Sequence, residues 1–439
     1  EISACLVGSE MCIRDRKKII QQAFFQLRNQ PLLSVITVLG TALAIALIMV
    51  ILIVYQAKTA DYAPEVNRSR SLYVKWERTV YDKKDPNSAG HSRPSLWLVK
   101  EIFYPLTTPE AVTATYEGGE VLVGTVGSDE EMNTPLMLTD AAFWKVYQFR
   151  FLAGKPFTEA DFQSGMKQAV IAKSVARRLF GGAENAIGKD ILVNFAAYTV
   201  CGVVDDVNRF CEFTWSEVYA PYTSNAIASE AEAGQTGGNN VITILARSTD
   251  DFDAIRNEVA RGVAQINTTL GDMELQLMGQ PDNFRMQLNR KFANQYENLN
   301  ANFWKYGIMI LIILLVPAIN LSGLTNTRMR RRLEELGIRK AFGATRNELV
   351  WQVLNENLVL TVMGGLLGLA LAYLFLWLMS DWLLQTVWGA TATMNASMVS
   401  PVIFLIAFGF CLILNMFSAY VPAWRVAHTP IVDSLNEKL

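Results

Sequence analysis

The sequence predicts a membrane protein with four transmembrane α-helices and a large α+β extracytoplasmic domain between helices 1 and 2. Three observations support this fold class. Hydrophobic residues make up 51% of the chain and concentrate in four blocks of membrane-spanning length. A long stretch of ordinary soluble composition lies between the first two blocks and is large enough to bury its own core. Lysine and arginine gather beside the blocks on one side only, which sets an orientation.

The segment before the first span has two parts. We expect residues 1–16 to be a non-native leader and leave them out of the fold. In residues 17–31, apolar side chains from Ile19 to Leu27 recur at helical spacing, with basic residues on the other side. This pattern indicates a cytoplasmic amphipathic helix on the membrane surface. The alternative is a basic flank of the span.

Four apolar blocks are expected to cross the membrane. The predicted spans are residues 32–55, 304–324, 349–379 and 402–420. The first carries no charge and contains several small residues suited to close helix packing. The second contains Pro317, which tends to kink a helix because it removes a backbone hydrogen bond.

Basic residues near the spans predict that both termini are cytoplasmic. Residues 325–348, between the second and third spans, hold seven lysines and arginines, whereas residues 380–401 hold none. By the positive-inside rule, residues 325–348 and the tail 421–439 are expected to lie in the cytoplasm. Residues 56–303 and the short loop 380–401 are then periplasmic.

The soluble stretch, residues 56–303, is expected to form an α+β domain with an insertion. Residues 60–117 follow a strand–helix–strand order and residues 239–285 a strand–helix order, whereas residues 118–238 are mainly β with turns. The predicted strands are residues 71–76, 112–116, 120–126, 168–171, 190–193, 198–204 and 240–246, and the predicted helices are 94–103, 140–147, 173–180 and 250–267. Residues 224–240 are expected to form a mobile loop.

The cytoplasmic loop 325–348 carries the most informative motif. Charged pairs four residues apart, such as Glu335 and Arg339, favour a helix. Gly337 and Gly343 weaken the helix at either end. Thr345, followed three residues later by glutamate, is a capping box that predicts a new helix start. A short helix across the membrane face could dock in the groove of a partner. The alternative is a basic anchor without a partner.

A family resemblance rests on several separated segments. The loop sequence Glu335-Leu336-Gly337-Ile338-Arg339-Lys340-Ala341-Phe342-Gly343-Ala344-Thr345 resembles the signature of FtsX-like ABC transporter permeases. It is followed, as in that family, by Glu356, Gly364-Gly365 and Gly368, and by a similar C-terminal Pro422-Ala423-Trp424-Arg425-Val426-Ala427. Residues 169–179, 186–189 and 198–204 resemble the MacB-like periplasmic core.

The resemblance implies an arrangement in the bacterial inner membrane. Such permeases pair as homodimers or heterodimers and bind cytoplasmic ABC ATPase subunits through the loop between spans two and three. ATP-driven motion is relayed to the outer domains for efflux or export, in some cases with a periplasmic adaptor. The residues assigned to ATPase coupling are Glu335, Gly337, Ile338, Arg339, Lys340, Ala341, Gly343 and Thr345. Gly364, Gly365 and Gly368 are assigned to helix packing, either within one chain or between two.

The sequence argues against catalysis by this chain itself. It has no Walker A motif, so ATP and Mg²⁺ are expected on a separate ATPase subunit. We expect no catalytic, metal or cofactor residues, and a net charge of −2 gives no reason to expect nucleic acid. For Cys201 and Cys211, two separate thiols are favoured over a disulfide. The alternative function is a membrane-anchored sensor or scaffold that controls a periplasmic partner, such as a cell-wall hydrolase, without transport.

Overall fold

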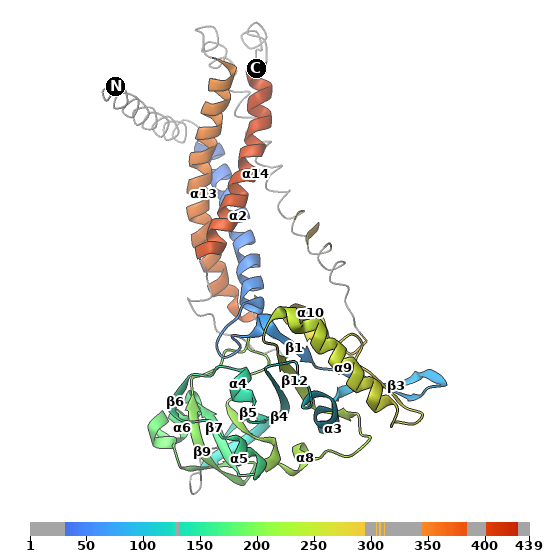
Figure 1. The fold of residues 1–439 in the computed structure, drawn as a ribbon. Coiled ribbons are helices and arrows are strands. Elements are labelled where there is room, and N and C mark those ends of the chain that lie inside the picture. Colours follow the sequence, from blue (N-terminus) through green and yellow to red (C-terminus); the bar gives the residue numbers. More distant parts are fainter. Residues whose placement is uncertain are drawn as a thin grey trace, which may run out of the picture. The chain divides into compact units, whose positions relative to one another are not determined.

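The computed structural model describes residues 31–125, 127, 131–294, 304, 307–308, 311, 345–383 and 401–428. The chain divides into two compact units (Figure 1). One unit, the helical unit, contains residues up to Ala57 and from Phe303 onwards. The other, Lys58–Asn302, is the outer domain.

The described part of the helical unit contains three long helices. These are α2 (Pro31–Thr59), α13 (Arg346–Leu383) and α14 (Pro401–His428). Within α13, Val353–Leu378 is long and apolar enough to cross a membrane, and α2 contains a shorter apolar stretch, Val38–Ile53. The predicted second span lies almost entirely outside the described residues. The described part of the chain therefore shows one of the four predicted spans by length and composition.

The outer domain is built on a ten-stranded sheet with the order β14-β1-β12-β4-β5-β10-β7-β9-β6, and β8 pairs with both β4 and β9. The strands are β1 (Ser71–Val74), β4 (Ala111–Thr125), β5 (Glu131–Thr139), β6 (Phe151–Gly154), β7 (Gln168–Ala172), β8 (Asp190–Val193), β9 (Ala196–Val204), β10 (Val218–Pro221), β12 (Asn240–Leu245) and β14 (Asp282–Asn283). The observed β7, β8, β9 and β12 coincide with predicted strands to within two residues.

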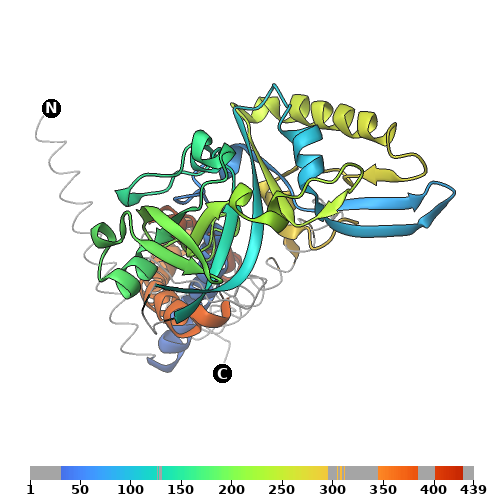
Figure 2. The same ribbon diagram turned by 90° about the horizontal axis from the view of Figure 1, so that it is seen from below.

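Six of these strands close into a barrel. β8 joins β4 to β9, so that β4, β5, β10, β7, β9 and β8 form a continuous ring of paired strands (Figure 2). Val123 faces Val193 across the closing pair, and Ile191 faces Tyr198 on the other side of β8. These four side chains are buried, as expected for the inward-facing residues of a small filled barrel.

The barrel lies within the predicted β-rich stretch 118–238, with one difference at its start. Residues 112–116 and 120–126 were expected to form two strands, but the structure has the single strand β4. The pairing of β4 with β5 shifts register between Glu117 and Glu120, around Gly118 and Gly119. The glycines thus mark an irregularity inside one strand.

A second, four-stranded sheet has the order β11-β3-β2-β13. Its strands are β2 (Glu77–Asp82), β3 (Asp85–Pro94), β11 (Gly237–Gly238) and β13 (Glu274–Gln276). The β2–β3 hairpin projects from the domain in both views. The sequence pattern missed it because β3 is polar and largely exposed. The stretch 224–240 was expected to be a loop, but it contains a short helix and β11.

Short helices connect the strands, and one longer helix covers the domain. The helices are η1 (Arg68–Arg70), α3 (Leu96–Leu98), η2 (Val99–Phe103), α4 (Phe143–Val146), α5 (Glu159–Gln163), α6 (Lys173–Phe180), α7 (Ala183–Ala186), η3 (Tyr222–Ser224), α8 (Ala226–Ser229), η4 (Thr249–Asp251), α9 (Phe252–Asn267) and α10 (Phe284–Asn289). α6 coincides with its predicted range and ends at Gly181, whose φ of 75° suits a helix C-terminus.

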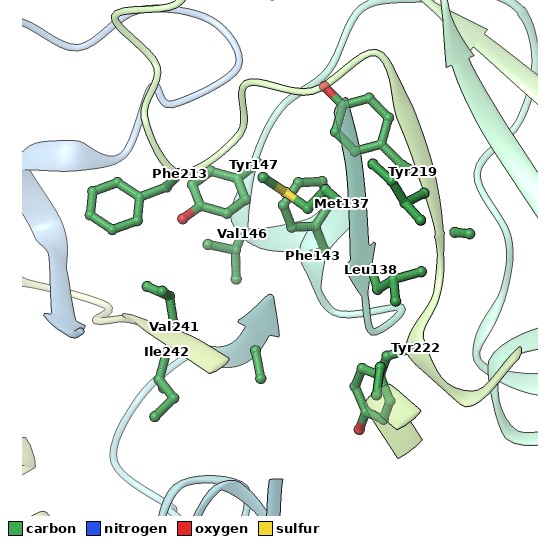
Figure 3. Close-up of a cluster of buried hydrophobic side chains, with 14 of the residues drawn as sticks. Met137, Leu138, Phe143, Val146, Tyr147, Phe213, Tyr219, Tyr222, Val241 and Ile242 are labelled. Atoms are coloured by element: carbon green, nitrogen blue, oxygen red, sulfur yellow. The ribbon is translucent and has the colours of Figure 1, made fainter. Parts of the chain in front are cut away.

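Aromatic side chains of α4 and β10 form the centre of the core. Phe143 of α4 and Tyr147, which directly follows α4, lie 5.0 Å apart between ring centroids, and Phe143 lies 6.0 Å from Tyr219 of β10 (Figure 3). All three are buried. Burying one such ring contributes about 1.5–3 kcal/mol, so this cluster holds α4 firmly against the sheet.

Candidate functional site

The structure describes only part of the predicted coupling site. Seven of its eight residues lie outside the described residues: Glu335, Gly337, Ile338, Arg339, Lys340, Ala341 and Gly343. Thr345 is exposed and directly precedes α13, which begins at Arg346.

The three glycines assigned to helix packing lie against neighbouring helices of the same chain. A Cβ atom on Gly364 would lie 2.8 Å from Cβ of Thr41, and one on Gly368 would lie 2.7 Å from the Ala42 carbonyl oxygen, both in α2. A Cβ atom on Gly365 would lie 2.5 Å from the ring of Phe408 in α14. Gly364 and Gly368 therefore allow α13 to approach α2 closely, and Gly365 allows it to approach α14.

A second site, unnoticed in the sequence, lies where the chain enters and leaves the outer domain. The entry strand β1 pairs directly with the exit strand β14. Leu72 lies opposite Asn283, and Tyr73 lies opposite Asp282. We call the residues that hold these strands together the entry–exit clamp. It consists of Glu65, Arg68, Tyr73, Phe213, Asp282, Phe284 and Arg290.

A buried ion pair anchors the entry side of the clamp. Nε of Arg68 donates to Oε2 of Glu65 at 2.7 Å, and both side chains are almost fully buried. The other Arg68 nitrogens donate to the carbonyl oxygens of Ala60 at 2.6 Å and Phe210 at 2.7 Å. One guanidinium thus joins the entry segment to the loop between β9 and β10.

Glu65 makes two further hydrogen bonds to the loop between β9 and β10. Its Oε1 accepts hydrogen bonds from the Phe213 backbone N–H at 2.9 Å and from Oγ1 of Thr214 at 3.0 Å. Burial raises the pKa of Glu65, while Arg68 and these two donors oppose that shift. Because every oxygen has a partner, the pair is satisfied in place, and removing Arg68 would leave an uncompensated charge.

The exit side has its own buried ion pair. Nη2 of Arg290 donates to Oδ1 of Asp282 at 3.0 Å, and Nε donates to Oδ2. Arg290 also donates to the carbonyl oxygens of Ala293 at 2.9 Å and Met278 at 3.1 Å. Burial raises the pKa of Asp282, and Arg290 opposes the shift. The bidentate geometry fixes β14 relative to the residues that follow α10.

Aromatic rings join the two halves of the clamp. Cζ of Arg68 lies 4.7 Å from the ring centroid of Phe284 in α10. Tyr73 stacks on Phe213 at 4.3 Å and contacts Phe284 at 5.7 Å between centroids. A cation over a buried ring contributes up to about 2 kcal/mol. Entry strand, exit helix and the β9–β10 loop are therefore packed as one unit.

Two other buried carboxylates of the outer domain have no cation among their described partners. Asp140 accepts hydrogen bonds from Thr113, Tyr104, Ala114 and Phe143. Glu77 accepts from Thr79 at 2.7 Å and from Ser92. Burial raises the pKa of both carboxyl groups, and their hydrogen bonds oppose the shift. Both sites join structural elements and lack the geometry of a catalytic pair.

The remaining chemistry-bearing residues have structural surroundings. Cys201 and Cys211 are free, and burial raises the pKa of both thiols to about 12, so neither is activated. Asp205 lies 3.7 Å from both Arg150 and Lys173 in surface ion pairs. No group of three His, Cys, Asp or Glu residues within the described ranges is arranged to hold a metal ion.

Comparison with known proteins identifies two domains in the chain. Residues 34–261 match the model of the MacB-like periplasmic core domain, and residues 307–431 match the FtsX-like permease C-terminal model. An uncharacterized ABC transporter permease, YknZ of Bacillus subtilis, is 23% identical over 81% of this chain and 85% of its own length. The macrolide export ATP-binding/permease protein MacB of Wolinella succinogenes is 25% identical over 95% of this chain and 60% of its own length.

Solved outer domains are also similar. The extracellular domain of YknZ matches 47% of this chain and 99% of its own, with 19% identity and a TM-score of 0.34. The periplasmic region of MacB from Actinobacillus actinomycetemcomitans matches 46% of this chain and 88% of its own, with 14% identity and a TM-score of 0.33.

Proposed function

Because this chain belongs to the family of FtsX-like permeases with a MacB-like periplasmic core domain, we propose that it relays the motion of a separate ATPase to its outer domain. The entry–exit clamp is the observation that carries this proposal. A domain that transmits movement must follow the two segments that connect it to the membrane helices. Here the strand after the entry segment, β1, pairs directly with the strand before the exit segment, β14, so a displacement of either strand acts on both.

The buried ion pairs extend this rigidity into the domain. Arg68 and Glu65 tie the entry segment to the β9–β10 loop, and that loop leads directly into the barrel strand β10. Arg290 and Asp282 hold the exit strand. Movement at the clamp is thus passed to the barrel through hydrogen bonds and packed rings without a flexible connection.

Energy enters at the cytoplasmic loop in this proposal. Residues 325–348 bind the ATPase, which holds ATP and Mg²⁺, and Arg339 and Lys340 pair with acidic residues of that subunit. Two permease chains and two ATPase subunits act together in the bacterial inner membrane. Both termini lie in the cytoplasm and the outer domain in the periplasm. The work performed is efflux or export of periplasmic or envelope cargo.

The close packing of the helices supports a role in relaying motion, in preference to forming a transport path through this chain. Gly364 and Gly368 bring α13 against α2, and Gly365 brings it against α14. Small residues at such contacts favour rigid helix association. A helical unit packed in this way moves as a body.

A substitution in the cytoplasmic loop, residues 325–348, tests the proposal. We expect Arg339→Glu to abolish co-purification of the ATPase from native membranes, while the permease remains folded. Lys291→Glu, which changes an exposed basic residue of the outer domain, serves as the matched control and retains the ATPase. If the wild-type permease retains no ATPase, the proposal fails, and the sensor or scaffold alternative takes its place.

A further inference from the structure

The segment that leaves the outer domain carries exposed basic and apolar side chains to which the relay proposed above gives no role. Arg285 and Leu288 are exposed on α10, and Lys291 and Phe292 are exposed directly after it. Leu288 is 36% and Phe292 53% accessible. We call these four residues the exit face. In Figure 1, α10 lies next to β1 of the outer domain.

The entry–exit clamp fixes which side of this segment is exposed. Every third side chain is buried: Phe284, Gln287, Arg290 and Ala293. Arg68 contacts the first of these, and the guanidinium of Arg290 donates to the carbonyl oxygen of Ala293 at 2.9 Å. Arg285 and Leu288 lie three residues apart and therefore share one side of α10. The exit face is thus the outward side of a segment whose inward side is bound.

The ring of Phe292 is held in position although half of its surface is open. Its centroid lies 5.8 Å from that of Trp76, the second residue after β1. A large ring with two side-chain torsions loses little conformational freedom when its open side is covered. Phe292 therefore offers apolar area for binding at a low entropic cost.

Charge along the exit segment has one sign. Residues 284–296 contain three basic residues and no acidic one. The structure describes residues 60–76 and 280–294 completely, and there the charges outside ion pairs are Asp61 and the two cations of the exit face. The ion pairs are Glu65–Arg68, Arg70–Glu110, Lys75–Glu212 and Asp282–Arg290. Asp61 accepts two hydrogen bonds within the entry segment, from Ser69.

Charges on the neighbouring elements are bound elsewhere. Arg256 of α9, which donates to the carbonyl oxygen of Pro281 at 3.1 Å, pairs with Asp253 at 3.0 Å. In the β9–β10 loop, Arg209 lies 4.6 Å from the ring centroid of Trp215.

The acidic residues of that loop bond to other parts of the barrel. Asp206 accepts from the backbone of Ser174 in α6, and Glu217 accepts from Thr134 in β5. Asp205 lies between two cations, as described above. The exit face therefore presents two cations beside exposed apolar side chains, without a facing carboxylate among the described contacts of α10.

Short chain segments tie the exit face to both of the first two predicted spans. Ala60 directly follows α2, whose apolar stretch ends at Ile53, and seven helical residues rise about 10 Å. Nη1 of Arg68 donates to the Ala60 carbonyl oxygen at 2.6 Å, while Cζ lies 4.7 Å from the Phe284 ring centroid. On the exit side, the predicted second span begins at residue 304, twelve residues after Phe292, or about 18 Å along a helix.

We propose that the exit face binds the surface of the membrane. Arg285 and Lys291 pair with the phosphate groups of anionic phospholipid, and Leu288 and Phe292 insert among the upper parts of the acyl chains. Basic residues beside apolar ones are typical of segments that lie in the membrane interface. The proposal rests on the proposed function only for the placement of the outer domain beside the membrane. It adds that the bilayer supports the exit strand while the relay moves, so that lipid composition affects the relay.

Photo-cross-linking identifies what covers the exit face. A photoreactive phenylalanine analogue replaces Phe292 in the full chain, which is reconstituted in nanodiscs of phosphatidylcholine, with or without about one third phosphatidylglycerol. Mass spectrometry then identifies the cross-linked product. We expect a phospholipid adduct whose yield rises at least about threefold with the anionic lipid. The measurement needs no bound ATPase.

A double variant tests the role of the two cations. Arg285→Gln combined with Lys291→Gln should reduce the adduct yield with phosphatidylglycerol to the yield with phosphatidylcholine alone. Lys167→Gln combined with Lys189→Gln is the matched control. It removes two exposed cations whose backbone carbonyls bond to the first half of β9, and it should leave the yield unchanged.

A second cross-linking position controls for exposure alone. Phe195 is 79% exposed and directly precedes β9, whereas the loop that bonds to Glu65 follows β9. The nine residues of β9 span about 30 Å, so this position lies far from the clamp. The same analogue at position 195 should give less than about one tenth of the phospholipid adduct found at position 292.

Each outcome decides for or against the exit face. The proposal is overturned if position 292 cross-links mainly to a second copy of the permease or to another protein, or if it yields no phospholipid adduct. It is also overturned if the yield depends neither on anionic lipid nor on the two cations. Co-purification of the ATPase separates these outcomes from the relay, which fails when the wild-type permease retains no ATPase, whatever position 292 contacts.

Discussion

The guanidinium of Arg68 lies 4.7 Å from the ring centroid of Phe284, and this contact joins the entry of the outer domain to its exit. The two residues are far apart in the chain, yet they share one buried cluster with Tyr73 and Phe213. The consequence is mechanical: neither end of the domain can move without disturbing the other.

Replacing Arg68 should destabilise the outer domain strongly. Arg68→Met keeps much of the apolar stem but leaves Glu65 buried without its cation, which costs about 3–5 kcal/mol. Urea unfolding followed by tryptophan fluorescence measures the loss. Arg70→Met is the matched control, because the Arg70–Glu110 pair is partly exposed, with Arg70 32% and Glu110 36% accessible. That change also removes hydrogen bonds from Arg70 to Asn67 and to the Ala246 carbonyl oxygen, but it should cost clearly less than Arg68→Met, because the carboxylate left behind is accessible to water.

A double variant isolates the charge effect from packing. Glu65→Leu combined with Arg68→Met removes both charges, so much of the stability lost in Arg68→Met should return. If the double variant is as unstable as the single one, the clamp depends on the shape of the arginine and its hydrogen bonds to Ala60 and Phe210 more than on the ion pair.

Sequence patterns predicted the local elements well and the clamp poorly. α6 and β8 coincide with their predicted ranges because an amphipathic repeat and a short apolar run are local signals. Arg68 and Asp282 resemble ordinary surface charges in the sequence. Their burial follows from the pairing of β1 with β14, which joins residues about 210 positions apart and leaves no local pattern.

Other differences have equally physical causes. The β2–β3 hairpin was missed because its second strand is polar, so it lacks the alternation that marks a half-buried strand. The barrel closure depends on β8 bridging β4 and β9, which no single segment encodes. Gly364, Gly365 and Gly368 were assigned to helix packing from the spacing of Gly364 and Gly368 and from the family resemblance, but the particular helices they contact are evident only in three dimensions.

Glu77 should make the outer domain less stable as the pH rises. Burial raises its pKa above the unfolded value, so the folded state binds the proton more tightly. Stability is then highest below the unfolded pKa and falls as the pH rises through the folded pKa. We expect Glu77→Gln to be more stable than wild type at pH 7–8 and to lose this advantage below about pH 4.

Glu258 provides a control of opposite sign. Burial acts to raise its pKa, but hydrogen bonds from Thr107 and Thr108 outweigh that effect and lower it. Glu258→Gln should therefore lower stability at neutral pH, with the difference fading as the pH falls. Urea unfolding at several pH values compares both variants with wild type. Parallel pH curves for Glu77→Gln and wild type would contradict the role given to Glu77.

Gly368→Ala should loosen the packing of α13 against α2. Its new Cβ atom would lie 2.7 Å from the Ala42 carbonyl oxygen, a backbone atom that cannot rotate away. Overpacking of this kind typically costs about 1–3 kcal/mol. Gly409→Ala is the control, since within the described part of the chain no heavy atom outside its own helix lies within 4 Å of the new Cβ. Thermal unfolding in detergent should show a lower midpoint for Gly368→Ala only, and equal midpoints would refute the close contact.

Asp282→Asn should open the exit side of the domain locally. The substitution removes the charge that Arg290 pairs with but keeps the shape of the side chain. A hydrogen bond to a charged group contributes about 1.5–3 kcal/mol, so amide exchange in β14 and α10 should speed up roughly tenfold or more. Asp253→Asn weakens the surface pair with Arg256, in which Asp253 is 91% exposed, and should change little. Hydrogen–deuterium exchange with mass spectrometry distinguishes the outcomes.

In the barrel strand β7, exchange should stay at the wild-type rate, because its hydrogen bonds do not depend on the clamp. Uniform acceleration of exchange across β7, β14 and α10 would contradict this prediction. It would mean that Asp282 stabilises the whole outer domain and not the exit side of the clamp alone.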